Sequence, residues 1–212
     1  MKIYGLFGLA MGLTALGVFL GALYAPMLFR SGVHFILLIV EIVLILGAPY
    51  WMEKSPLNIL LFGLFPLFSG ITIAPYLLYV ATVVPNGSAI LLNALLATVF
   101  MSSAAAVFAR TTSLQLQSLG RFLLFGVLGL IGLGLLQLFV PALRQSMGFE
   151  MGLSAAGIVI FAAFTAFDVQ RIAQMGRAGA NPFLLALSLY LDIFNLFLYI
   201  LRFMMALSGN RR

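Results

Sequence analysis

The sequence predicts an all-α integral membrane protein with seven transmembrane helices. Of its 212 residues, 64% are hydrophobic and only 8% are charged, whereas a soluble domain carries about a quarter charged residues. The mean hydropathy is +1.19, so there are too few polar side chains to cover a water-facing surface. The apolar residues form long runs, and each run can cross a hydrocarbon layer of about 30 Å at about 1.5 Å per helical residue.

Charges, prolines and glycine clusters divide the chain into seven segments. We expect spans at residues 4–25, 33–51, 57–80, 88–109, 119–140, 150–171 and 182–207. The connections between them are short. We therefore expect residues 1–212 to form a single transmembrane domain, with any function inside the helical bundle.

The first and third segments carry distinct packing signals. No small-x-small cleavage site follows the first segment, so we interpret it as a helix rather than a signal peptide. Its two glycine pairs, Gly8/Gly12 and Gly17/Gly21, would let neighbouring helix backbones approach closely. Two prolines in the third segment predict kinks or lost backbone bonds.

The last four segments are bounded mainly by charges. The fourth ends before Arg110, and the fifth contains the glycine-rich run 126–134. The sixth begins at Glu150, and the seventh follows a glycine-rich loop.

The lysines and arginines of the loops predict the topology. Seven spans place the termini on opposite sides of the membrane. The bases on the N-terminal side are Lys2, Lys54, Arg110, Arg121, Arg171 and Arg177, and those on the other side are Arg30, Arg144, Arg202, Arg211 and Arg212. The loop charges favour a cytoplasmic N-terminus. Because the bases are scattered singly, we expect no nucleic-acid partner.

Two residue types limit the chemistry. The chain has no cysteine and one histidine, His34, which excludes disulfides and thiolate ligands and leaves no zinc site. We therefore expect no bound cofactor.

Three acids lie inside expected spans, where a charged group is costly and usually functional. Glu41 and Asp192 are each about ten residues from a span end, or about 15 Å deep. Asp168 is shallower unless its helix continues past Arg171. A short loop joins the sixth and seventh spans, so contact between Asp168 and Asp192 is expected.

A polar stripe follows one face of the seventh span. Its members are spaced 4, 3, 4 and 3 residues apart, and they are Ser188, Asp192, Asn195, Tyr199 and Arg202. Helical geometry places such residues on one face, as in the lining of an internal path.

Two carboxyl groups that meet in a poorly solvated place cannot both ionise at low cost, so they share a proton. Such a pair can act as a pH switch that clamps two helices when protonated. When deprotonated, it repels them or takes up a cation. Calcium needs several oxygen ligands, and a loose site of this kind suits ion transit.

Several segments resemble the Bax inhibitor-1 family of membrane proteins. LSLYLDIFNLFLYILRF at 187–203 resembles the last-helix signature, FTAFDVQRI at 164–172 the sixth-helix element, and FSGITIAPYL at 68–77 the third-helix element. Glu41 in LLIVEIVLIL matches a second-helix acid. The resemblance covers nearly the whole chain.

This resemblance implies a last helix that is central and surrounded by the other six. It also implies a pH-sensitive calcium leak channel, with Asp168 and Asp192 as sensor and transient calcium ligands. Calcium would be the transported ion. Relatives can carry a basic latch after the second helix, but here Met52 begins that region and only Lys54 is basic. Lys54 is therefore a possible gate.

Other functions remain open. A proton-coupled cation transporter would use the same carboxyl pair, and a regulatory membrane protein would bind partners in the bilayer. We expect no enzyme. An intramembrane aspartyl protease needs Gly-x-Gly before its last aspartate, where this chain has Leu-Tyr-Leu.

Overall fold

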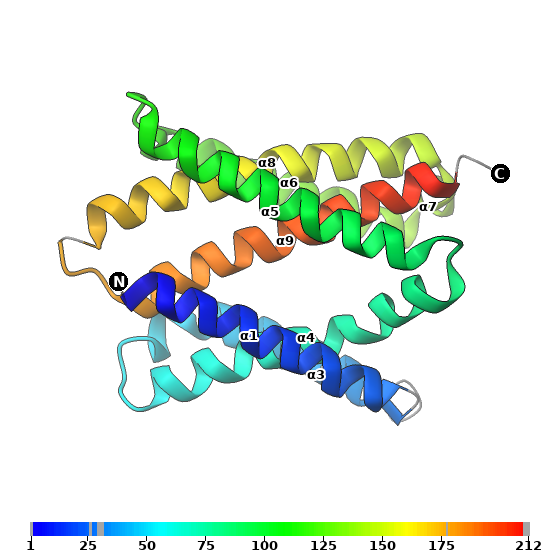
Figure 1. The fold of residues 1–212 in the computed structure, drawn as a ribbon, viewed down its shortest axis with the longest axis horizontal. Helices are drawn as coiled ribbons and strands as arrows, with labels where there is room; N and C mark the ends of the chain where they lie inside the picture. The colour runs from blue at the N-terminus through cyan, green and yellow to red at the C-terminus, as the bar shows by residue number, and fades with distance from the viewer. Residues whose placement is uncertain (1, 26, 29–31, 177, 210–212) are drawn as a thin grey trace. The chain divides into compact units, whose positions relative to one another are not determined.

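The computed structural model describes residues 2–25, 27–28, 32–176 and 178–209 (Figure 1). Within these ranges every regular element is a helix. The helices are α1 (Lys2–Leu23), α3 (Val33–Trp51), α4 (Leu57–Val83), α5 (Gly87–Thr111), the 3-10 turn η1 (Leu116–Leu119), α6 (Gly120–Phe139), α7 (Pro141–Gln145), α8 (Met147–Met175) and α9 (Pro182–Gly209).

Seven helical segments are long and apolar enough to cross a membrane, with η1 and α6 counted together as one. The predicted class, an all-α protein with seven spans, is therefore confirmed. All seven expected spans correspond to these helices. The main difference is in α8, which begins three residues before the expected span and continues four residues beyond it. Asp168 thus lies seven residues, or about 10 Å, from the end of its helix.

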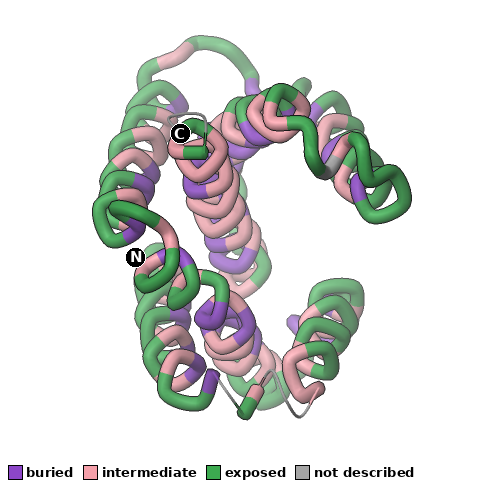
Figure 2. The backbone as a smooth tube through the Cα atoms, turned by 90° about the vertical axis from the view of Figure 1, so that its right-hand side faces the viewer, coloured by how far each residue is buried: buried purple, intermediate pink, exposed green. Residues whose placement is uncertain are grey.

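The surface is apolar along the helices as well as at their ends. Figure 2 shows exposed residues throughout the lengths of the helices. Large side chains such as Tyr50, Phe122 and Phe139 are at least three-quarters exposed. Such an outer surface fits hydrocarbon as the surrounding solvent, because backbone polar groups are satisfied within each helix.

The chain divides into two compact units. The first contains residues 1–88 and 176–190, and the second contains residues 89–175 and 191–212. The single-domain organisation and the central position of the last helix stay predictions. Arg30, Arg177, Arg211 and Arg212, which enter the topology prediction, lie outside the described residues, as does the side chain of Arg144.

In the first unit, α1 and α4 pack side by side through glycines. A Cβ on Gly17 would lie 2.2 Å from the Leu67 carbonyl oxygen, and a Cβ on Gly21 would lie 2.6 Å from the Cβ of Ala74. The helices therefore approach closely because these positions lack side chains. At Gly8 and Gly12 a Cβ would meet nothing within 4 Å among the described residues. The packing role is confirmed for the second glycine pair only.

Helix α4 runs without interruption through Pro66 and Pro75, both of which are buried. Neither proline ends the helix. The first part of α9 packs in the same unit, where the buried Tyr190 hydroxyl is 2.8 Å from the Thr14 hydroxyl.

In the second unit, the connection between α5 and α6 is hydrogen-bonded to α8. The side-chain amide of Gln170 accepts a hydrogen bond from the Leu116 backbone N–H (2.8 Å) and donates one to the Leu114 carbonyl (2.9 Å). This arrangement satisfies two backbone groups of an irregular segment.

Candidate functional site

Two aspartates meet between α8 and α9 in the second unit. Asp168 is 1% exposed and Asp192 is 6% exposed. Their carboxyl groups are close enough to interact with each other. The contact expected from the short loop between the two helices is therefore present.

Arg171 supplies the nearest positive charge to this pair. Its guanidinium lies 3.7 Å from Oδ1 of Asp168, one turn away on the same helix. The Arg171 side chain is about a quarter exposed, while that of Asp168 is almost fully buried. The arginine therefore offsets part of the negative charge and keeps contact with the surroundings of the helix end.

The arrangement suits the binding of a proton or a cation. Burying a carboxylate without compensation is costly, and one arginine cannot neutralise two full negative charges. Among the described residues, Oδ2 of Asp192 is buried and lacks a hydrogen-bond partner. This oxygen can be satisfied by protonation of the pair or by an ion.

The described residues place only two carboxyl groups together at this site. Among the residues that the structure describes, no group of three or more His, Cys, Asp or Glu could hold a metal. Calcium takes about six to eight oxygen ligands. Two carboxyl groups would supply only some of these oxygens.

Two further members of the α9 stripe lie beyond Asp192. The Asn195 amide donates a 2.8 Å hydrogen bond to the Leu191 carbonyl of its own helix. The Tyr199 ring stacks on Phe161 with centroids 5.5 Å apart, and a Cβ on Gly157 would lie 2.2 Å from this ring. Tyr199 therefore fills the space that the glycine leaves.

Arg202 and Glu150 form an ion pair at the other end of the second unit. The Arg202 guanidinium donates two hydrogen bonds to Glu150, one of them 2.9 Å long, and a third of 2.7 Å to Oε1 of Gln137. The Gln137 amide also donates to Glu150 at 2.9 Å. This closed network joins α6, α8 and α9.

Glu41 and Ser188 belong to the first unit. Glu41 accepts hydrogen bonds from the Ser69 hydroxyl (2.8 Å) and the Thr72 hydroxyl (2.7 Å) of α4. It thereby links α3 to α4. Ser188 is half-buried on α9, one turn before Asp192. Whether these residues and the rest of the stripe line an ion path stays a prediction.

The possible gate, Lys54, is exposed in the turn between α3 and α4. Met52 beside it is buried. Its carbonyl accepts hydrogen bonds from the Asn58 amide (3.3 Å) and the Asn181 amide (2.9 Å). Burial of the Met52 side chain and the two hydrogen bonds to its carbonyl therefore stabilise this turn. Gating by Lys54 stays a prediction.

Sequence reasoning missed the partners of these charged groups. The spacing of Asp168 and Arg171, three residues apart on one helix, could have indicated their pairing. Glu150 and Arg202 lie at the same end of two antiparallel spans, which was also a usable signal. No sequence signal points to Gln137 or to the contact between Thr14 and Tyr190.

Comparison with known proteins agrees with the fold. The family model described as inhibitor of apoptosis-promoting Bax1 matches residues 1–210. An uncharacterized protein of Campylobacter jejuni is 30% identical, covering 98% of this chain and 87% of its own length. The inner membrane protein YbhL of Escherichia coli is 27% identical, covering 100% of this chain and 91% of its own length.

Proposed function

The chain belongs to the Bax inhibitor-1 family, and from this membership we propose that it is a pH-sensitive calcium leak channel. It is a multi-pass protein of the bacterial inner membrane. The proposed gate is the pair Asp168 and Asp192, whose protonation holds α8 and α9 together. Loss of the proton leaves two negative charges that separate the helices or attract a cation.

The observation that carries this proposal is the meeting of two buried carboxyl groups inside the membrane spans. A purely structural role would favour full pairing of each acid, as Arg202 and Gln137 provide for Glu150. The aspartate pair instead includes a buried carboxyl oxygen, Oδ2 of Asp192, without a hydrogen-bond partner in the described part of the chain. Intramembrane acids in such settings commonly serve ion pathways and proton relays.

The test is calcium flux through purified protein in liposomes over a range of pH. We expect calcium to leak down its gradient with a rate that changes with pH. Asp168→Asn and Asp192→Asn should each flatten this dependence, because asparagine does not titrate in this range. Glu53→Gln, which removes an exposed carboxylate from a loop, is the matched control and should leave the pH profile unchanged. An unaltered profile in both aspartate variants would refute the carboxyl switch.

A proton-coupled cation exchanger is the second candidate, since the same buried pair can bind protons in exchange for an ion. The two functions differ in proton movement. An exchanger moves protons against calcium in a fixed ratio, whereas a leak dissipates the calcium gradient without such a ratio. A pH-sensitive dye inside the same liposomes separates them.

The proposal includes neither an enzymatic activity nor a bound cofactor. Calcium and protons are the proposed partners, together with the lipid bilayer. If reconstituted protein passes no ion at any pH, a regulatory role through partners in the membrane replaces the channel proposal.

A further inference from the structure

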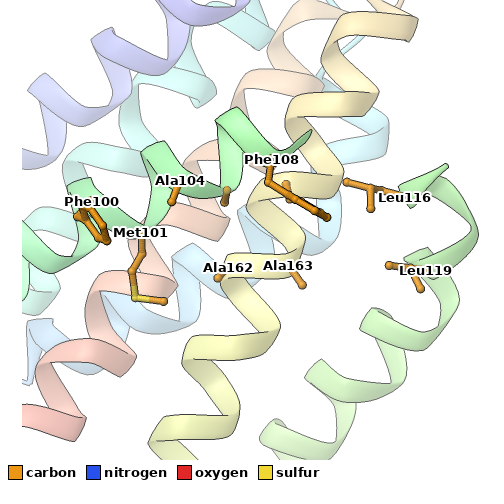
Figure 3. Close-up of a pocket in the computed structure, with 10 residues that line it drawn as sticks. Phe100, Met101, Ala104, Phe108, Leu116, Leu119, Ala162 and Ala163 are labelled. Carbon is orange, nitrogen blue, oxygen red and sulfur yellow. The ribbon is translucent and has the colours of Figure 1, made fainter. Parts of the chain in front are cut away.

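The first unit contains a connected cluster of polar side chains. In the second unit, α5, η1 and α8 line an apolar cavity of about 470 Å³, with Phe108, Leu116 and Ala163 among its walls (Figure 3). The first unit instead brings one carboxyl group and four hydroxyl groups together, from α1, α3, α4 and α9. These side chains, which we name the Glu41 cluster, are Thr14, Glu41, Ser69, Thr72 and Tyr190.

Hydrogen bonds connect the Glu41 cluster from one helix to the next. Glu41 of α3 is hydrogen-bonded to the hydroxyls of Ser69 (2.8 Å) and Thr72 (2.7 Å) on α4. The Ser69 hydroxyl also interacts with the Tyr190 hydroxyl of α9. The Tyr190 hydroxyl in turn lies 2.8 Å from the Thr14 hydroxyl of α1. The four hydroxyl residues are buried, and Glu41 is half-buried.

Packing holds the tyrosine of the cluster in place. Tyr190 is fully buried, and its ring meets the ring of Phe65 edge to face, with centroids 6.1 Å apart. Phe65 lies one turn before Ser69 on α4, so this contact fixes the tyrosine beside the serine. The cluster is therefore preorganised, which lowers the cost of binding.

The two hydroxyls beside Glu41 have a choice of acceptors. Oγ of Ser69 lies 3.1 Å from the Phe65 carbonyl oxygen, and Oγ1 of Thr72 lies 3.0 Å from the Phe68 carbonyl oxygen. A hydroxyl donates one proton and accepts through its lone pairs. Ser69 and Thr72 can therefore donate to an ionised Glu41. When they turn to their carbonyls instead, their oxygens can accept from a protonated Glu41.

The same reversal extends to α1. The Thr14 hydroxyl can donate to the Ala10 carbonyl, 3.0 Å away, or to the Tyr190 hydroxyl. With Glu41 ionised, each hydroxyl proton of the chain can point toward the carboxylate. With Glu41 protonated, each can point the other way, and the chain ends on the Ala10 carbonyl. Because both states use the same partners, the change needs no movement of the helices.

The surroundings of Glu41 make these hydroxyls necessary. Helix α3 is a span, and the neighbours Ile42 and Val43 are 59% and 61% exposed, so hydrocarbon, which offers no hydrogen bonds, borders this part of the helix. The titratable groups with an electrostatic effect on Glu41 are His34, two turns earlier on α3, and Tyr190. Helix α4, which packs against α3, has no Asp, Glu, His, Lys or Arg.

We propose that the Glu41 cluster is a proton-binding site of the first unit, in addition to the one proposed for the aspartate pair. Binding adds one proton to a carboxylate oxygen of Glu41 and reverses the hydroxyl hydrogen bonds, and release restores them. The proposal rests on the contacts of this cluster, and it holds whether or not the aspartate pair gates a calcium leak.

The test is infrared difference spectroscopy of the full-length protein in lipid vesicles, comparing acidic with alkaline pH. The chain has only five acids, so few carboxyl bands arise. In Asp168→Asn/Asp192→Asn we still expect acidification to produce the carbonyl band of a protonated carboxyl shielded from water. Adding Glu41→Gln should abolish this band. Adding Glu53→Gln, the matched control in an exposed loop, should leave it.

Two further measurements connect the band to the cluster. Ser69→Ala should shift its frequency, because the protonated carboxyl loses an acceptor, whereas Tyr79→Phe, at an exposed tyrosine of the same helix, should not. Isotope labelling of the glutamate carboxyls should lower the frequency in the protein without substitutions, so the assignment does not depend on the folding of a variant. A band that is insensitive to pH, survives Glu41→Gln or ignores the glutamate label would overturn the proposal.

Discussion

At the residue scale, the acids of the second unit have two different environments. Glu150 is enclosed by donors from Arg202 and Gln137, so its charge is compensated where it lies. Asp168 and Asp192 interact with each other, and both lie near the guanidinium of Arg171. The first arrangement stabilises a fixed ionisation state, while the second leaves the number of bound protons open to change.

Removing Arg202 tests the first arrangement. Arg202→Leu should destabilise the protein by roughly 1–3 kcal/mol, because it leaves the Glu150 carboxylate uncompensated. This is less than for a fully buried pair, since both side chains are partly exposed. The measurement is thermal unfolding in detergent. The double variant Glu150→Gln/Arg202→Leu should recover part of the loss, and Lys54→Leu, in an exposed turn, should change little. No loss in Arg202→Leu would mean that the pair is not structural.

The residue scale also shows where sequence reasoning stops. The meeting of Asp168 and Asp192 could be predicted because a short loop joins their helices. The partners of Arg202 could not, since Gln137 is 65 residues away and an apolar span gives no pattern that fixes helix rotation.

At the element scale, close approach of helices depends on particular glycines. Gly17 and Gly157 each lie where a Cβ would collide with a neighbour. At Gly12 and Gly152 a Cβ would meet nothing within 4 Å in the part of the chain that the structure describes. In α1 the packed pair Gly17/Gly21 and the unpacked pair Gly8/Gly12 have the same spacing of four residues. Only the rotation of each helix, set by tertiary packing, distinguishes them, so the sequence predicted the glycine contacts of α1 only in part.

Two alanine substitutions on α8 measure the contribution of the contact between Gly157 and the Tyr199 ring. Gly157→Ala should destabilise the protein by about 1–3 kcal/mol, because the new methyl group overlaps the Tyr199 ring. Gly152→Ala adds the same methyl group in open space and should be neutral or stabilising by up to about 1 kcal/mol, from helix propensity. Thermal unfolding of both variants gives the difference. Equal melting temperatures would show that the ring moves aside without cost.

At the scale of the whole molecule, composition and run length were sufficient to predict seven spans and their approximate bounds. The expected bounds of α8 are less accurate, because the charge of Arg171 predicts a span end there, whereas the helix continues to Met175. In the structure Arg171 continues the helix and pairs with Asp168. From the sequence alone, a charged residue inside a helix cannot be distinguished from one just beyond the end of a helix. The ion-pair partner of the residue, here Asp168, makes the distinction.

The natural absence of cysteine makes the topology prediction simple to test. Ser113→Cys lies in the connection after α5, and Ser88→Cys lies in the first turn of α5, at the opposite end of this span. Both positions are exposed. An impermeant maleimide added to intact spheroplasts should label Ser88→Cys alone if the N-terminus is cytoplasmic. The reverse labelling pattern would invert the topology, and the cysteine-free parent protein supplies the background.

Because Gln170 of α8 is hydrogen-bonded to the connection between α5 and α6, this connection can report movement of α8. Gln170 is two residues after Asp168 on α8, and its amide grips the backbone on both sides of Gln115. A displacement of α8 that alters the surroundings of Asp168 would therefore move this connection or break its two hydrogen bonds to Gln170. A spin label at the exposed Gln115 would register such movement as a change in mobility, at the membrane surface and without any probe inside the bilayer.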